Sequence, residues 1–175
     1  MKYYENDTDA TVGSLPANSV CFVVNGSPGL QLIANTIGLY KTPGTVTTGG
    51  RSANAQTEQY TDPNGMVYNI NFVSPAVPAT INVNLSVTPL AGWSSDYVAQ
   101  IQAAITAFIE TYGIGAVLPW SEFYLPAYLA GTTAQGTYSV SALQTELNSG
   151  GFATTDITLN FDAVPVAGTI NVTVL

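Results

Sequence analysis

The chain contains no histidine, one cysteine and only three basic residues among its 175 residues. Without histidine it lacks the usual general base and the commonest metal ligand, so Ser-His-Asp and Cys-His nucleophile systems cannot form within it. Lys2, Lys41 and Arg51 stand against eleven carboxylates, which leaves a formal net charge of −8. So few basic side chains cannot neutralise a phosphate backbone, which argues against nucleic-acid binding and against an anionic membrane surface.

The single cysteine, Cys21, excludes a disulfide within the chain. It lies in the apolar run 20–24, and we therefore interpret it as a small buried strand residue and not as a reactive thiol. No apolar run reaches the ~18 residues that a membrane-spanning helix needs. The opening residues MKYYENDTDA have no apolar core, so we expect no signal peptide.

Charged residues make up 8% of the chain, although apolar residues reach 46%. Ordinary soluble domains carry roughly a quarter charged residues. Thr, Asn, Ser and Gln take the place of charge here, and such a surface costs little to bury against a neighbouring protein. The composition therefore favours a chain in lasting contact with partners.

The hydrophobic pattern predicts an α+β protein in which antiparallel strands pack beside helices. Three-to-four spacing of apolar residues predicts helices at 30–40 and 95–112, and a short helical segment is expected at 122–130. Alternation and short apolar runs predict strands at 19–25, 66–73, 80–88, 138–147, 157–161 and 169–174, of which 138–147 is ambiguous with a short helix. The polar segment 45–59 has no clear period, and we interpret it as a loop or an irregular hairpin arm.

A repeated segment suggests how the chain is divided. Thr-Ile-Asn-Val occurs at 80–83 and again at 169–172, each time shortly after a Val-Pro pair. We interpret each copy as the closing strand of a small domain, with 66–73 and 80–88 forming a hairpin across Pro75 and Pro78. The prediction is an extended lead-in at 1–18, a first α+β domain at 19–90 and a second at 91–175, each with antiparallel strands packed against one or two helices.

Paired carboxylates are the one route to catalysis that the composition leaves open. The candidates are Asp96, Glu110, Glu122, Glu146, Asp156 and Asp162. Each is explained better by a structural role than by catalysis, whether as a helix cap, an exposed helix residue or a residue in a turn. Asp7-Thr8-Asp9 and the turn at 62–65 resemble fragments of a calcium loop but lack its remaining ligands. We therefore predict no catalytic, cofactor-binding or metal-binding residue and do not expect an enzyme.

Aromatic residues gather in the second half of the chain, where sugar stacking is a possible use. Their helical context favours core packing or an interface anchor for Trp93, Trp120, Phe123, Tyr124 and Tyr128. Two hypotheses stay open beside an assembly role. One is a carbohydrate-binding or adhesin-like module, and the other is a carboxylate-dependent hydrolase.

Several segments together resemble the baseplate J-like family, the wedge proteins of contractile-tailed bacteriophages and related injection machines. The resemblance rests on an acidic lead-in, a strand ending in Val-Val-Asn-Gly, a helix ending before Pro-Gly, and a Gly-x-x-Tyr-x-Ile-x-Phe strand before Val-Pro. In this chain these are residues 4–12, 23–26, 37–45 and 62–78, and the segments 101–127 and 156–174 are similar as well. Two departures are Lys41-Thr42 in place of a basic pair and Ser74-Pro75 in place of Arg-Pro.

The resemblance implies a structural role without catalytic residues: a wedge subunit of the tail baseplate, bound to other baseplate proteins and to copies of itself. It implies no cofactor, no small-molecule substrate and no nucleic-acid partner. It also implies a virion protein made in the cytoplasm of the bacterial host. Family members are roughly twice as long, so we expect this chain to correspond to a C-terminal portion of such a protein.

Overall fold

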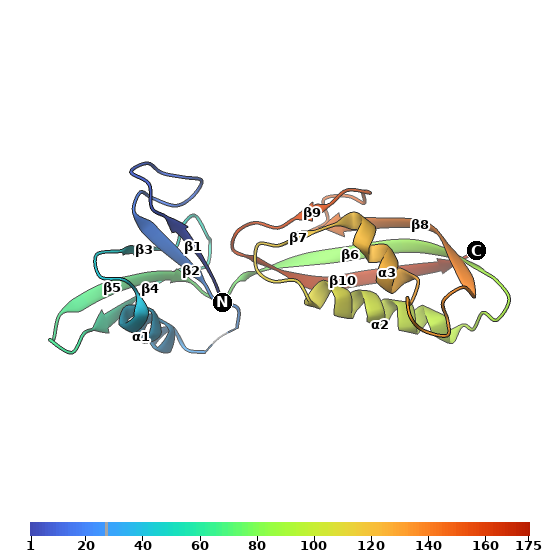
Figure 1. The fold of residues 1–175 in the computed structure, drawn as a ribbon, viewed down its shortest axis with the longest axis horizontal. Helices are drawn as coiled ribbons and strands as arrows, with labels where there is room; N and C mark the ends of the chain where they lie inside the picture. The colour runs from blue at the N-terminus through green and yellow to red at the C-terminus, as the bar shows by residue number, and fades with distance from the viewer. Residues whose placement is uncertain (27) are drawn as a thin grey trace. The chain divides into compact units, whose positions relative to one another are not determined.

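The protein has an α+β fold that divides into two compact units, Met1–Val77 (unit 1) and Pro78–Leu175 (unit 2). The structure is a computed structural model that describes residues 1–26 and 28–175 (Figure 1). Its sheets are mainly antiparallel, and each unit has its own helices and its own buried core. The predicted fold class is confirmed.

Unit 1 consists of a five-stranded sheet and one helix. The strands are ordered β1-β2-β5-β4, with β3 beside β2. The β1–β2 and β4–β5 pairs are antiparallel, and β3 and β5 run parallel to β2. The elements are β1 (Lys2–Asn6), β2 (Ser19–Val23), α1 (Leu30–Tyr40), β3 (Val46–Thr48), β4 (Ala55–Thr61) and β5 (Val67–Val73).

Helix α1 covers one face of this sheet, as its apolar spacing predicts. Ile33 and Ile37 are buried in one cluster with Phe72 of β5. Gly38 allows the helix to lie close to β4, because a Cβ at this position would stand 2.3 Å from the ring of Tyr60. The apolar stripe and one glycine thus fix how α1 packs on the sheet.

Two predictions for unit 1 are wrong. The predicted lead-in includes strand β1, which pairs with β2 from Lys2 opposite Val23 to Asn6 opposite Ser19. The predicted loop at 45–59 contains β3 and the start of β4. Strand β4 reads AQTEQYT and lacks alternating apolar residues, so the sequence pattern does not reveal it. Its pairing with β5 and its contact with α1 stabilise this strand instead.

Unit 2 has a three-stranded sheet in the order β10-β6-β8 and a small β7–β9 pair. Its long helix spans 96–110, within the predicted 95–112, and the segment 138–147, which the sequence left ambiguous between strand and short helix, is a strand. The last strand starts at Ala163, earlier than predicted, and β9 is shorter. The elements are β6 (Val77–Pro89), α2 (Asp96–Glu110), β7 (Val117–Leu118), the 3₁₀ helix η1 (Trp120–Phe123), α3 (Tyr124–Ala127), β8 (Tyr138–Leu147), β9 (Ile157–Thr158) and β10 (Ala163–Val174).

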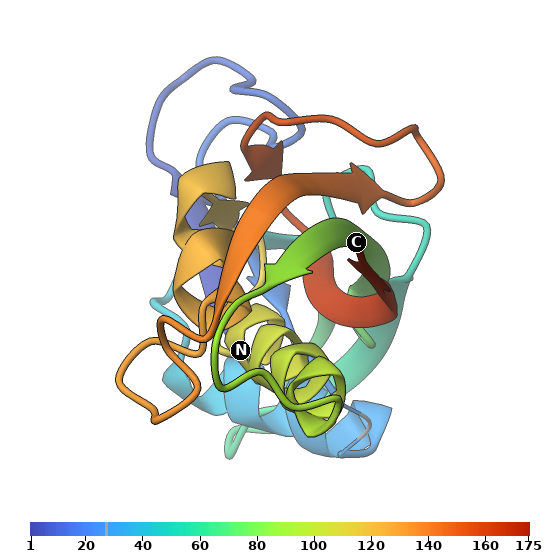
Figure 2. The ribbon, with the colours of Figure 1, turned by 90° about the vertical axis from the view of Figure 1, so that its right-hand side faces the viewer.

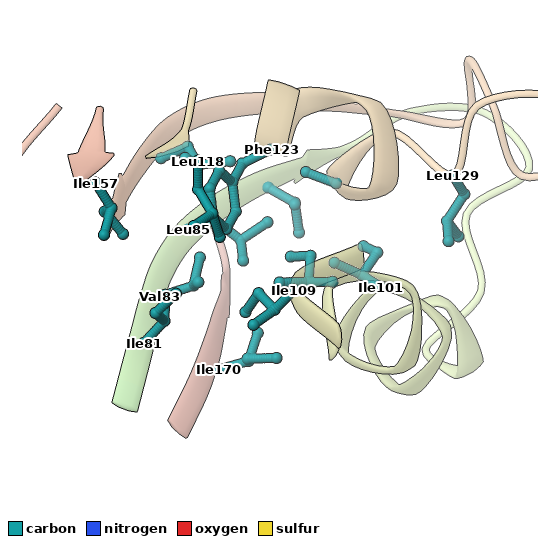
Figure 3. Packing of buried hydrophobic residues seen from close by; sticks show 14 of the residues in the cluster. Ile81, Val83, Leu85, Ile101, Ile109, Leu118, Phe123, Leu129, Ile157 and Ile170 are labelled. Carbon is teal, nitrogen blue, oxygen red and sulfur yellow. The ribbon is translucent and has the colours of Figure 1, made fainter. Parts of the chain in front are cut away.

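One large apolar cluster forms the core of unit 2. Alternate residues of β6 point into it, and Figure 3 shows Val83 and Leu85 directed toward the same space as Ile101 and Ile109 of α2. Phe123 enters the cluster from η1 and is fully buried. The same face of the sheet is therefore covered by α2 and by the η1–α3 segment.

The predicted hairpin between 66–73 and 80–88 is wrong. Strand β5 pairs with β2 and β4, whereas β6 pairs with β8 and β10. Pro75 thus belongs to the connection that leads from unit 1 into β6, and the predicted boundary at residue 90 lies at the far end of that strand. Alternation shows that a strand has one buried face, but it does not show which strand will be its partner.

The repeated Thr-Ile-Asn-Val segments lie in one sheet and do not close two separate domains. In both ribbon views β6 and β10 run side by side (Figures 1 and 2). The side chain of Asn82 accepts a bond from the backbone N–H of Thr169 at 2.8 Å, and Asn171 donates to Asn84 at 2.9 Å. Residue numbers rise together along the two strands, so they are parallel.

Asn82 also holds the third strand of this sheet. Its amide nitrogen donates to the carboxylate of Glu146 on β8 at 2.8 Å. One side chain therefore bridges β10, β6 and β8 on the polar face of the sheet. In the first copy of the repeat, this bridge is the role of the asparagine between two apolar residues.

Candidate interaction surface

The candidate carboxylates are dispersed and take structural roles. Asp156 accepts the backbone N–H of Trp120 at 2.9 Å, and Glu146 accepts from Asn82 and from the N–H of Gly151. The other four take the positions that the sequence suggests: Asp96 is the first residue of α2, Glu110 is exposed at its end, Glu122 lies in the first turn of η1, and Asp162 is buried in the turn before β10.

The two calcium-loop fragments are also explained by local structure. The carboxylate of Asp62 accepts the backbone N–H groups of Asn64 and Met66, which fixes the turn after β4. Asp9 accepts a bond from the side chain of Asn18 at 3.3 Å. Within residues 1–26 and 28–175, no group of three or more histidine, cysteine or acidic side chains is placed to hold a metal ion.

Cys21 is fully buried in β2, where its register partners are Tyr4 of β1 and Thr48 of β3. The interpretation as a small buried strand residue is confirmed. A thiol in this position has no access to solvent, so it contributes packing to unit 1.

The aromatic residues of unit 2 form a chain of ring contacts. Trp120 meets Tyr124 edge-on at 5.3 Å, Tyr124 stacks with Tyr128 at 6.2 Å, and Tyr128 stacks with Tyr138 at 6.3 Å. Trp93 meets Tyr138 edge-on at 5.2 Å. These ring contacts contribute to the packing of unit 2, against whose core Trp93, Trp120 and Tyr124 lie.

Two tyrosines in unit 2 have raised pKa values. Partial burial and the nearby carboxylate of Glu122, which accepts the hydroxyl's hydrogen bond, raise the pKa of Tyr112 from 10.0 to about 12. Burial, followed by the neighbouring Tyr128, raises the pKa of Tyr138 to about 12 as well. Both groups therefore hold their protons more tightly in the folded protein than in the unfolded chain.

We expect the free energy of unfolding to fall as the pH rises from 10 to 12, because the unfolded chain loses these protons first. Tyr112→Phe should make this fall smaller, because it removes one of the two groups with a raised pKa. Urea unfolding at a series of pH values measures the effect. An identical alkaline loss in Tyr112→Phe and the wild type would contradict the assignment.

The most unusual surface of unit 1 is the outer side of α1. This helix, LQLIANTIGLY, contains no charged residue. Leu32 is 60% exposed, Leu39 61% and Tyr40 81%. The helix also exposes the polar residues Gln31, Asn35 and Thr36, but its exposed large apolar side chains give this side the character of an interface.

An apolar groove of about 450 Å³ lies beside α1. Leu32, Thr36 and Tyr40 follow one another at four-residue spacing along its helical side, and Phe22 of β2 and the terminal residue Met1 also line it. Lys41, the residue that follows α1, stands at its end. Leucines at positions 32 and 39, outside the buried stripe of 30–40, are the sequence signal for this surface, but our interpretation of 30–40 considered only the buried stripe.

Unit 2 carries a different kind of surface on the uncovered face of its sheet. Amides and hydroxyls line a shallow hollow there, including Asn84, Gln102, Gln144, Asn171 and Thr173. Several are already engaged, since Gln102 donates to the carbonyl of Ile170 at 2.8 Å and Asn171 to Asn84. The lining of this hollow is polar and uncharged, and we assign it no ligand.

In the part of the chain that the structure describes, no helix combines the length and apolar character needed to cross a membrane. Neither the models of known protein families nor the curated proteins include a match to this sequence.

Proposed function

We propose that this protein is a structural subunit of the baseplate wedge of a contractile bacteriophage tail, and that it acts by binding neighbouring proteins. The observation that carries the proposal is the outer face of α1, where Leu32, Leu39 and Tyr40 lie exposed on a helix without charge. Exposed apolar surface of this kind is stabilised when a partner covers it.

Two further observations support an assembly role. The charged fraction of 8% lowers the desolvation cost of burying surface between subunits. The sequence resemblance to baseplate J-like proteins spans both units, from the acidic lead-in to β10. The carboxylates, which were the one catalytic possibility, support turns and strand contacts instead.

The experiment removes the gene from a phage that encodes this chain and examines the particles. We expect wild-type tails to contain the chain at a fixed ratio to the tube protein, by mass spectrometry of purified tails. Particles without the gene should lack complete baseplates in electron micrographs, and a plasmid copy should restore them. Infectious particles with normal tails in the absence of the gene would overturn the proposal.

A further inference from the structure

Strand β4 forms an open edge of the five-stranded sheet in unit 1. At one end of this strand the carbonyl of Asn54 accepts the N–H of Ser74 at 3.2 Å. At the other end the N–H of Asp62 donates to the carbonyl of Met66 at 2.9 Å, so the even-numbered residues direct their backbone groups at β5. Because these groups alternate in direction along a strand, those of the odd-numbered residues in Ala55–Thr61 point away from the sheet. All of these odd-numbered residues are exposed.

The outward backbone groups of β4 are mostly unpaired. The carbonyl of Gln59 accepts the side-chain amide of Gln31 at 2.7 Å. Within residues 1–26 and 28–175, no hydrogen bond reaches the outward groups of Thr57 and Thr61. Exposed edges are commonly blocked by lysine, proline or a bulge. Strand β4 reads AQTEQYT and pairs with β5 in unbroken register, so it has none of these protections.

A row of unpaired N–H and C=O groups is satisfied by another extended backbone, and the sequence of β4 is complementary to itself. In an antiparallel pair centred on Gln59, Thr57 lies opposite Thr61 of the other strand, and both gain backbone partners. Glu58 then lies opposite Tyr60, so no like charges face each other. A pair centred on Glu58 would instead place one carboxylate opposite another.

Helix α1 adds to the same side of unit 1, because it lies over β4 and its Gln31 bonds to the edge itself. Asn35 and Leu39 follow Gln31 at four-residue spacing, and Leu39 is 61% exposed. A two-fold axis at Gln59 places this uncharged row next to the same row of a second copy. The helices thus enlarge the contact toward the roughly 800 Å² that each partner buries in a stable dimer.

The distribution of charge also favours contact through unit 1. All three basic residues lie in this unit beside five acidic ones, which gives it a net charge of −2. Unit 2 has six acidic residues and no basic one, so its net charge is −6. Two copies therefore repel each other least where unit 1 faces unit 1.

We propose that two copies of this chain pair through the β4 edges of unit 1, antiparallel and centred on Gln59. The two five-stranded sheets then form one continuous sheet, with α1 of each copy beside α1 of the other. Backbone hydrogen bonds join the strands, and the uncharged sides of the helices shield these bonds from water. The pairing does not depend on the wedge role proposed above, because the purified chain forms it alone.

Sedimentation equilibrium of the full chain over a concentration series should show a monomer–dimer equilibrium. Residue 59 lies opposite itself only in this register, so a charge placed there tests the register directly. Gln59→Lys and Gln59→Glu should each dimerise about fivefold more weakly than the wild type, because like charges then face each other. An equal mixture of the two variants should associate at least as tightly as the wild type. Gln144→Lys adds a charge to an exposed glutamine of β8 and should leave association unchanged.

A second pair of variants tests the backbone bonds. Thr57→Pro removes an outward N–H and leaves the bonds to β5 intact, so the strand should still form. Each copy then loses a backbone bond to the other, and we expect dimerisation to weaken at least about tenfold. Thr57→Val is the matched control, since both substitutions remove the hydroxyl that bonds to Asn71 at 2.7 Å but valine keeps the N–H. Circular dichroism checks that both variants are folded.

Four results would overturn the proposal. These are a chain that stays monomeric up to millimolar concentration, equal effects of Gln59→Lys and Gln144→Lys, equal effects of Thr57→Pro and Thr57→Val, and a mixture of charged variants that does not restore the dimer. A dimer that is lost in Leu32→Asp but unchanged in Gln59→Lys would also overturn it, because copies would then meet through the outer face of α1. Absence of the chain from purified tails overturns the wedge role and leaves the result on β4 standing.

Discussion

Phe123→Ala is expected to lower the free energy of unfolding of unit 2 by about 3–5 kcal/mol. Phe123 is fully buried, and its ring meets Phe108 edge-on at 5.1 Å. It belongs to the cluster in which β6, α2 and the η1–α3 segment meet, so alanine leaves a cavity at the point that holds these elements together. A domain is usually stable by only about 5–15 kcal/mol, so the loss is a large share of the total.

Urea unfolding followed by circular dichroism measures this loss. Phe152→Ala is the matched control, because the same side chain is partly exposed there and its removal leaves no enclosed cavity. We expect the control to change stability by less than about 1 kcal/mol. Because each unit has its own core, the variant should show an earlier transition that belongs to unit 2. A loss below about 1 kcal/mol for Phe123→Ala would contradict the packing of this core.

The second large effect is expected at Asn6, the last residue of β1. Its side chain is 3% exposed. Its amide nitrogen lies within hydrogen-bond distance of the carbonyls of Ala10, Leu15 and Pro16, at 2.8 to 3.0 Å, and its oxygen accepts from Thr8. One buried amide therefore closes the whole loop between β1 and β2.

Asn6→Asp keeps the shape of the side chain but removes the donors and places a carboxylate among three carbonyl oxygens. We expect it to destabilise unit 1 by about 3 kcal/mol, and Asn6→Ala by about 1–3 kcal/mol, because the carbonyls lose their partner in both cases. Amide hydrogen exchange should rise at 7–18 and at the β1–β2 pair.

Asn18→Asp provides the control, since Asn18 makes a single long side-chain bond, to Asp9 in the same loop, and water screens the repulsion between the two carboxylates at this exposed site. Asn18→Asp should change both the free energy of unfolding and the amide hydrogen exchange far less than Asn6→Asp does. Equal effects of Asn6→Asp and Asn18→Asp would show that the loop does not depend on the buried amide. Lower loss in Asn6→Asp than in Asn6→Ala would contradict the donor role directly.

The sequence by itself determined the fold class and the helices and strands that carry a clear apolar pattern. Helices α1 and α2 were predictable because apolar residues recur at helical spacing, and β6 because Ile81 to Val87 alternate with polar residues. The position of Cys21 followed from its apolar neighbours, and the turn at Asp62 from its own turn chemistry. All of these depend on interactions between residues close in the chain.

Tertiary structure alone decided the pairing of strands and the division of the chain. The alternation of β6 does not show that this strand pairs with β8 and β10 and not with β5, because any strand with one apolar face can pair with several others. Strands β1 and β4 carry no apolar alternation, since their neighbours in the sheet stabilise them. The groove at Leu32 likewise exists only where α1 meets the sheet, because an interaction surface is shaped by residues distant in sequence.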